Sequence, residues 1–147
     1  LQAIPCVRPI TDGLKPGMAL CFQGVVPENA KEFAVNLQTG PSNEDDKALH
    51  FKPCIGQKVT LNSFRNGKWE SEESASVEPF TSGAPFTMFL MFLQVIVNGL
   101  QHCMFKHRVP LEKVSALTIR GDVSMNMLGL IKVSNLIIFC VRHNNCF

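Results

Sequence analysis

The six cysteines of this 147-residue sequence include no Cys-x-x-Cys pair. Zinc sites of the finger type and thioredoxin-like redox sites need that spacing, so neither is expected, and no other metal or cofactor is indicated. The cysteines are irregularly spaced, and 46% of the residues are apolar, which is enough for a core without cross-links. Free thiols in a reducing compartment are therefore favoured over disulfides.

A membrane-spanning run is also missing. The longest apolar run, residues 86–97, is far shorter than the roughly 20 residues that a membrane helix needs. The first residues include Pro5, Arg8 and Asp12 but no apolar stretch of the signal-peptide kind, and the sequence has no Asn-x-Ser/Thr acceptor. We therefore expect no membrane insertion and a cytoplasmic location, with export to the extracellular space without a signal peptide left open.

Neither positive nor negative charge is in large excess, because the formal net charge is only +2 at pH 7. Basic residues such as Lys106, Arg108 and Lys113 are interleaved with apolar residues and proline, and they form no basic stripe. Nucleic acid is therefore not an expected partner.

Short β-rich segments separated by turn residues run through most of the chain. Asn66-Gly67 is a strong hairpin signal, and Asn98-Gly99 marks another turn. The sequence has no sustained helical periodicity and no internal repeat, and its length favours one domain. The pattern predicts an all-β sandwich or barrel. The expected strands are 18–26, 32–37, 48–51, 58–63, 68–77, 100–106, 115–120 and 123–131.

Residues 86–97 depart from this pattern because they contain no turn residue. As a single strand they would extend ~40 Å, well beyond a common strand. Tight hairpins normally use Gly, Asn or Asp, and none of these occurs in the run. We expect two strands joined by a very tight or shortened connection.

Polar side chains and the only tryptophan lie at regular positions in three neighbouring segments. Alternation places His50, Lys52 and Cys54 on one face of a strand, and Asn62 on the same face of the next. With Trp69 beside them, these groups suit a sugar, whose hydroxyls need fixed donors and acceptors and whose apolar ring face needs an aromatic plate. A single tryptophan or histidine is more often structural, so this interpretation depends on the combination.

The same residues make a poor active site, and no enzyme is predicted. His50 and Cys54 are four residues apart along a strand, or ~13 Å, whereas a nucleophile and its base need about 3 Å. Glu72 and Glu73 point to opposite faces of a strand, so they are not a glycosidase carboxylate pair.

The order of several short motifs resembles that of galectins, the small β-galactoside-binding lectins, over residues 14–131. The resemblance is greatest to the first domain of two-domain galectins. It implies a jelly-roll-like sandwich of two antiparallel sheets with sugar bound across the concave face. Residues 1–13 are then an N-terminal extension, and residues 132–147 are an atypical apolar C-terminal tail. The matching motifs are Phe33-Ala-Val-Asn-Leu, Leu49-His50-Phe51-x-Pro53, Asn62-Ser63, Trp69-x-x-Glu72, Pro79-Phe80, Val95-x-Val97-Asn98-Gly99, Phe105-x-His107-Arg108 and Leu117-x-Ile119-x-Gly121-Asp122-Val123.

The resemblance also implies roles for individual residues. His50 meets the axial hydroxyl of galactose, Asn62 and Glu72 meet the exocyclic hydroxyl, and Trp69 stacks on the sugar ring. His107 and Arg108 belong to a segment that is structural in the family. The carbohydrate-binding candidates are His50, Lys52, Cys54, Asn62, Trp69 and Glu72.

Two arginines of the family pattern are replaced in this chain. The family's His-x-Asn-Pro-Arg ends here in Lys52-Pro53-Cys54, and its Trp-x-x-Glu-x-Arg ends in Ser74. Lys52 is expected to replace part of the lost contacts and to pair with Glu72. We therefore predict a lectin for β-galactosides on glycoconjugates, with an altered and weakened site. The alternative is a galectin-fold protein-interaction module that has lost sugar binding, and a homodimer is left open.

Overall fold

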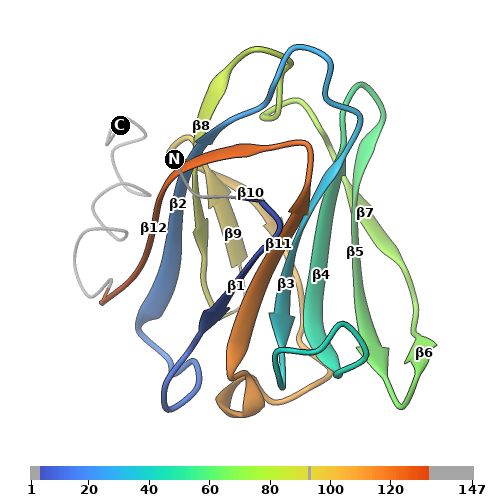
Figure 1. The fold of residues 1–147 in the computed structure, drawn as a ribbon, viewed down its shortest axis with the longest axis vertical. Coiled ribbons are helices and arrows are strands. Elements are labelled where there is room, and N and C mark those ends of the chain that lie inside the picture. Colours follow the sequence, from blue (N-terminus) through green and yellow to red (C-terminus); the bar gives the residue numbers. More distant parts are fainter. Residues whose placement is uncertain (1–3, 93, 133–147) are drawn as a thin grey trace.

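The chain folds into two antiparallel β-sheets packed face to face (Figure 1). The computed structural model describes residues 4–92 and 94–132. The strand order of the seven-stranded sheet is β1-β11-β3-β4-β5-β6, with β7 also paired to β5, and that of the five-stranded sheet is β10-β9-β8-β2-β12. The predicted all-β sandwich of two antiparallel sheets is confirmed. The strands are β1 (Cys6–Pro9), β2 (Met18–Val25), β3 (Phe33–Gln38), β4 (Lys47–Cys54), β5 (Lys58–Arg65), β6 (Lys68–Trp69), β7 (Glu73–Ala75), β8 (Pro85–Leu90), β9 (Gln94–Val97), β10 (Leu100–Met104), β11 (Ala116–Gly121) and β12 (Ser124–Lys132).

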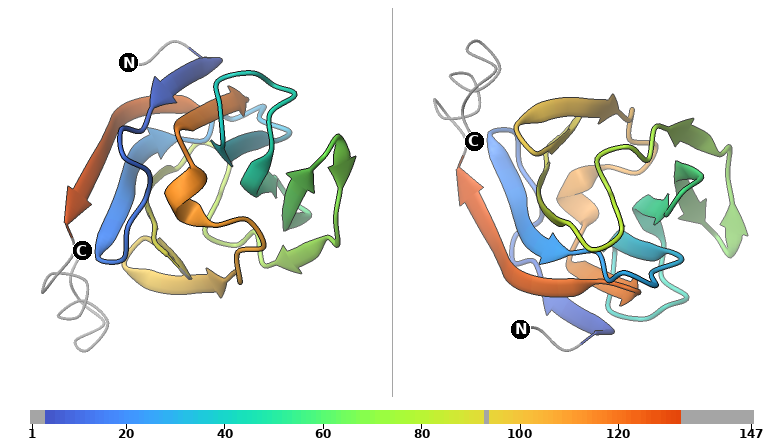
Figure 2. Two further views of the ribbon diagram at one scale, coloured as in Figure 1. Left: turned by 90° about the horizontal axis from the view of Figure 1, so that it is seen from below. Right: turned by 90° about the horizontal axis from the view of Figure 1, so that it is seen from above.

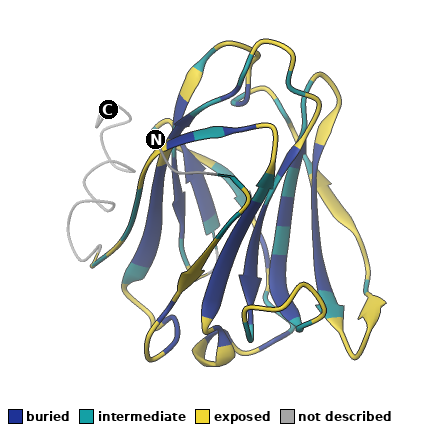
Figure 3. Ribbon diagram, viewed as in Figure 1, coloured by how far each residue is buried: buried dark blue, intermediate teal, exposed yellow. Residues whose placement is uncertain are grey.

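The two curved sheets face each other, as the views along the strands show (Figure 2), and the core residues lie between them. Alternation along β3 turns Phe33, Val35 and Leu37 inward. The Phe33 ring stacks on Phe86 of the five-stranded sheet and meets Phe80 edge-on, with centroids 5.6 Å apart in both pairs. Each buried phenylalanine contributes about 1.5–3 kcal/mol. Buried residues follow the strands of both sheets, whereas the turns at their ends are exposed (Figure 3).

Two hairpins form at the predicted Asn-Gly pairs. Asn66 and Gly67 have φ of 53° and 76°, and Asn98 and Gly99 have φ of 51° and 82°. Two successive positive φ angles are what a two-residue hairpin of matching twist requires, and Asn and Gly tolerate them best. The first of these turns fixes the register in which Trp69 pairs with Phe64 of β5.

The turnless run at 86–97 contains two strands, β8 and β9, as expected. They pair in the register Leu90 with Val95, and the Met91 N–H donates to the Gln94 carbonyl oxygen at 3.0 Å. Met88, Leu90 and Val95 remain buried. The short connection therefore leaves the inward-facing residues of both strands in the core.

The structure describes a strand before the N-terminal boundary of the predicted domain, whereas it does not describe the tail after the C-terminal boundary. Residues 6–9, which the sequence resemblance left in an N-terminal extension, form β1 and pair with β11 from Cys6–Ile119 to Pro9–Ala116. The apolar tail lies outside the described residues beyond Lys132. The described part contains one short 3-10 turn, Leu111–Lys113, and no helix long and apolar enough to cross a membrane.

Candidate functional site

Five of the six candidate residues lie around one pocket on the outer face of the seven-stranded sheet, the face that points away from the core. The pairing of β4 with β5 places His50 opposite Asn62 and Lys52 opposite Thr60. Trp69 of β6 and Glu72, which precedes β7, close the pocket on the far side of β5. Its volume is about 300 Å³, and its lining residues are His50, Lys52, Thr60, Asn62, Trp69 and Glu72.

Trp69 presents an exposed aromatic face to this pocket. Its side chain is 52% exposed. The indole packs against the His50 ring with centroids 4.7 Å apart, and against Phe64 with centroids 5.0 Å apart. These neighbours support the ring while leaving apolar surface open, which is the arrangement that stacking on a ligand ring requires.

A chain of buried polar side chains begins on the same face in β3. Gln38 Nε2 donates hydrogen bonds to the carbonyl oxygens of Gly40 at 3.0 Å and Ser42 at 2.9 Å. Because the amide nitrogen is committed to these carbonyls, Gln38 Oε1 faces Thr118 and accepts a hydrogen bond from its hydroxyl at 3.0 Å. The backbone of residues 40–42 therefore fixes the direction in which the Thr118 hydroxyl donates.

This direction determines the tautomer of His50. Thr118 Oγ1 donates to Gln38, so it accepts from Asn36 Nδ2 at 3.0 Å, and Asn36 Oδ1 is left to accept from His50 Nδ1–H. His50 thus carries its proton on Nδ1 and has a lone pair on Nε2. Burial, followed by the positive charges of Lys52 and Lys47, lowers the pKa of His50 from 6.5 to about 4. At neutral pH the ring is an uncharged hydrogen-bond acceptor.

Asn62 is held by a second network, which contains Arg108. Asn62 Nδ2 donates to the Glu70 carbonyl oxygen at 3.2 Å, and Oδ1 accepts from Arg108 Nη1 at 3.2 Å. Arg108 also donates to Ser63 Oγ at 2.9 Å and to Glu73 Oε2 at 2.8 Å. Because an amide nitrogen has two hydrogens and one is used, Asn62 retains one donor for a ligand.

The two charged residues of the pocket are only weakly engaged with protein partners. Glu72 Oε2 lies 3.7 Å from Lys58 Nζ, and Lys52 Nζ lies 3.9 Å from Glu32 Oε2. The expected pairing of Lys52 with Glu72 is thus replaced by two separate, solvent-exposed ion pairs. Exposed pairs of this kind have little net strength, so both side chains are available to a ligand.

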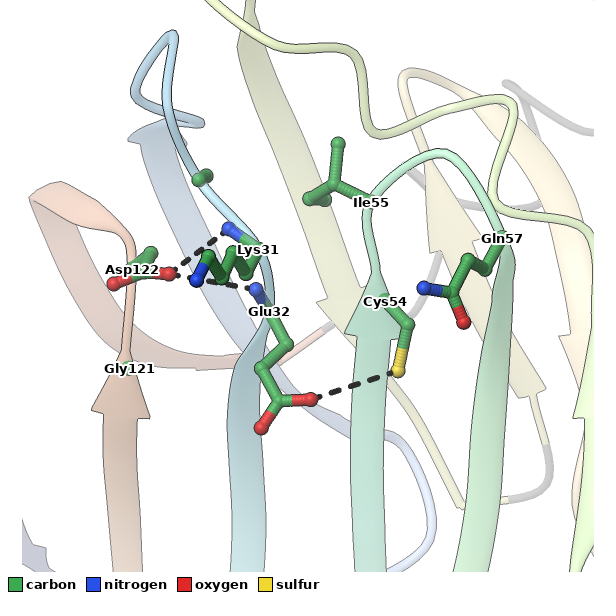
Figure 4. A pocket seen from close by; sticks show the side chains of 8 residues that line it. Lys31, Glu32, Cys54, Ile55, Gln57, Gly121 and Asp122 are labelled. Atoms are coloured by element: carbon green, nitrogen blue, oxygen red, sulfur yellow. Dashed lines mark hydrogen bonds between the residues drawn. The ribbon is translucent and has the colours of Figure 1, made fainter.

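Cys54, the sixth candidate, lies outside the pocket. It lines a separate hollow of about 610 Å³ where β3, β4 and β11 meet their neighbouring loops (Figure 4). Its Sγ faces Glu32 Oε2 at 3.9 Å, and the Asp122 carboxylate across the hollow accepts a hydrogen bond from the Lys31 N–H at 2.9 Å. A thiol is short and a weak donor, so Cys54 contributes nothing to the pocket at His50.

Several residues that support the site were not candidates from the sequence. Asn36 and Gln38 alternate with the core residues of β3, which was the available signal, since polar side chains buried on a sheet face need partners. Arg108 was interpreted as structural. It lies in the irregular segment between β10 and β11, where no periodic pattern indicates which way a side chain points.

Comparisons with known proteins point to one lectin family. A family model described as galactoside-binding lectin matches residues 5–129. Galectin-4 of Bos taurus is 39% identical over 134 residues, covering 87% of this chain and 40% of the relative. Galectin-7 of Homo sapiens is 34% identical over 135 residues, covering 88% of this chain and 99% of the relative. The chain therefore spans about two-fifths of galectin-4 but nearly all of galectin-7.

A solved structure is similar over almost the whole described fold. Sheep galectin-11, in a complex with glycerol, superposes with a TM-score of 0.80 at 25% identity, over 89% of this chain and 100% of that one. The family match covers every residue of the pocket and all of both sheets except the last residues of β12. The chain belongs to the galactoside-binding lectin family, the galectins.

Proposed function

We propose that this chain binds β-galactosides of glycoconjugates at the pocket around His50, with lower affinity than a site that has both family arginines. The observation that supports this most is the placement of four complementary groups in one pocket. They are an acceptor at His50 Nε2, a donor at Asn62 Nδ2, a carboxylate at Glu72 and an exposed aromatic face at Trp69.

Each group has a partner in galactose. The axial 4-hydroxyl donates to His50 Nε2, because the lone pair there faces the pocket. The 6-hydroxyl accepts from Asn62 and donates to Glu72, which uses both capacities of a hydroxyl. The less polar face of the ring then lies against Trp69. No covalent step is involved.

The loss of affinity follows from Cys54 and Ser74. An arginine offers a rigid fork of donors, whereas a thiol or a short hydroxyl offers one weak or short-reaching group. Hydrogen bonds to charged groups contribute roughly 1.5–3 kcal/mol each, and 1.4 kcal/mol is a factor of ten. We therefore expect the loss of the arginine at position 54 by itself to weaken lactose binding by about one to two orders of magnitude.

Trp69 fluorescence tests the proposal directly, because it is the only tryptophan of the chain and is 52% exposed. Adding lactose should shift its emission to shorter wavelength as the sugar displaces water from the indole. Sucrose, a disaccharide of the same size without β-linked galactose, should leave the spectrum unchanged. An emission that responds to neither sugar would reject the sugar site and favour the protein-interaction module.

The binding of lactose should also depend on pH in a specific way. The neutral imidazole is the binding form, and its pKa is lowered to about 4 by burial and by the nearby lysines. Affinity should therefore stay constant from pH 8 to about 5 and fall near pH 4. Because the folded state disfavours protonated His50, the free energy of unfolding should decrease as the pH falls from 6.5, the ordinary pKa of histidine, to about 4. Calorimetric titrations across this range would contradict the assignment if affinity were already lost near pH 6.5.

A further inference from the structure

Lys47 is a buried lysine on the outer face of the seven-stranded sheet, with 4% of its surface exposed. Regular alternation would place Lys47 and His50 on opposite faces, because they are three residues apart. The register of β4 against β5 shifts between them, so that Lys47 lies opposite Phe64. Ala48 and Leu49, the two residues in between, both belong to the core. This β-bulge therefore brings Lys47 to the face on which the pocket lies.

The ammonium group of Lys47 is held by carbonyl oxygens and an aromatic ring. Nζ donates to the carbonyl oxygens of Asn43 at 2.8 Å and Asp45 at 3.3 Å. It also lies over the Phe64 ring, 4.8 Å from the centroid. No ion pair within residues 4–92 and 94–132 includes Lys47. An ammonium has three N–H groups, so two carbonyl oxygens and one aromatic face satisfy this buried charge.

Phe64 lies between this charge and Trp69. The Phe64 ring meets the indole with centroids 5.0 Å apart and planes at 62°. The indole in turn lies 4.7 Å from the His50 ring. A cation fixed over the face of Phe64 restricts the rotation of that ring, and the ring restricts the indole beside it. Trp69 is thus packed on one side against a buried charge and its ring, although its own side chain is 52% exposed.

The loop between β3 and β4, residues 39–46, holds both halves of the pocket. Its carbonyl oxygens accept hydrogen bonds from Gln38, where the polar chain to His50 begins, and from Lys47. In addition, Asp46 Oδ1 accepts from a backbone N–H in the turn between β5 and β6, at 3.0 Å. The loop and this turn lie at the same end of the sheet (Figure 1). One loop therefore supports the hydrogen-bonding side and the aromatic side of the pocket.

From these contacts we infer that Lys47 and Phe64 are positioning residues for Trp69, and that they set the tilt at which the indole meets a sugar. The inference rests on the proposed function for what Trp69 binds, whereas the contacts that restrain the indole exist without a ligand. A restrained indole loses less conformational freedom when a sugar binds, so it holds the sugar more tightly than a mobile one. This contribution matters in a pocket that lacks the family arginines at Cys54 and Ser74.

Two substitutions of Phe64 separate its ring from its apolar volume. Phe64→Leu keeps most of the volume but removes the ring. The fluorescence anisotropy of Trp69 in the free chain should then fall, and lactose should bind about 3- to 10-fold more weakly, as expected for the loss of one aromatic pair. Phe64→Tyr, the conservative variant, keeps the ring and should retain most of the anisotropy and of the affinity. Trp69 is the only tryptophan, so the anisotropy reports on it alone.

Lys47→Gln tests the buried charge, because it keeps an amide donor for the loop carbonyls but removes the cation. It should lower the anisotropy of Trp69 and weaken lactose binding about 2- to 5-fold. Lys113→Gln makes the same change at an exposed position of the 3-10 turn. Phe92→Leu removes an exposed ring from the connection between β8 and β9. Both control variants should leave anisotropy and affinity unchanged.

Thermal melts of the same variants distinguish positioning from a purely structural role. If Phe64→Leu lowers the melting temperature but the folded chain keeps its Trp69 anisotropy and lactose affinity, the inference is overturned. If Phe64→Leu does not fold, Lys47→Gln decides the same question. A Lys47→Gln chain that behaves like the unmodified one overturns the role of Lys47.

Failure of the proposed function gives a different result. A chain that binds no lactose rejects the sugar site, and with it any effect of Lys47 and Phe64 on sugar affinity. The anisotropy of the free chain still decides whether these two residues restrain Trp69, because that measurement needs no ligand.

Discussion

Replacing Cys54 by arginine together with Lys52 by asparagine should raise the affinity for lactose by about 10- to 100-fold. Arginine at position 54 would restore a long, two-pronged donor at a strand position whose thiol now faces Glu32 at 3.9 Å. The second change is needed because Lys52 already approaches Glu32 at 3.9 Å and would compete with the new guanidinium for the same carboxylate.

Titration calorimetry of the double variant and of each single variant measures this effect. Cys54→Gln with Lys52→Asn is the matched control, since glutamine lengthens the side chain without adding charge, and it should give little gain. A folded double variant that binds lactose no better than the unmodified chain would show that the weakness lies elsewhere in the pocket.

Thr118→Val should destabilise the fold and weaken lactose binding together. Thr118 is fully buried and stands between Gln38 and Asn36 in the polar chain that ends at His50. Valine has the same shape but no hydroxyl, so Asn36 Nδ2 loses an acceptor and Gln38 Oε1 loses a donor. Each unsatisfied buried group costs about 1–3 kcal/mol. The melting temperature should fall by roughly 5–15 °C.

Thermal melts and lactose titrations of the same samples separate the two effects. Thr118→Ser keeps the hydroxyl and should retain most of the lactose affinity, although it loses a buried methyl group. If Thr118→Val bound lactose as tightly as the unmodified chain, the His50 tautomer would not depend on this chain of hydrogen bonds.

The parts of the fold that could be predicted are those set by local rules. Asn66-Gly67 and Asn98-Gly99 form hairpins because few other residues tolerate two positive φ angles. The pairing of His50 with Asn62 on one face follows from strand alternation and the short connection between β4 and β5.

The parts that could not be predicted depend on distances along and between strands. Alternation places Cys54 on the same face as His50, but it does not say that the thiol is too far along β4 to reach the pocket. The sequence pairs Lys52 with Glu72 by charge alone, whereas Glu32 is the acid that the sheet brings close. Arg108 reaches Asn62 from an irregular segment, and such segments carry no periodic signal.

Trp69 and His50 lie in different parts of the sheet, one at its edge and one near its centre. Trp69 is in a strand of two residues at the sheet edge, whereas His50 lies in a central strand and is tied to a buried polar chain. The hydrogen bonds that hold His50 run through Asn36, Thr118 and Gln38, and none of them involves the edge strand of Trp69. Under the proposed function, changes at Trp69 would therefore adjust how strongly a sugar is held, whereas His50 in the central strand would distinguish sugars by the stereochemistry of their hydroxyls.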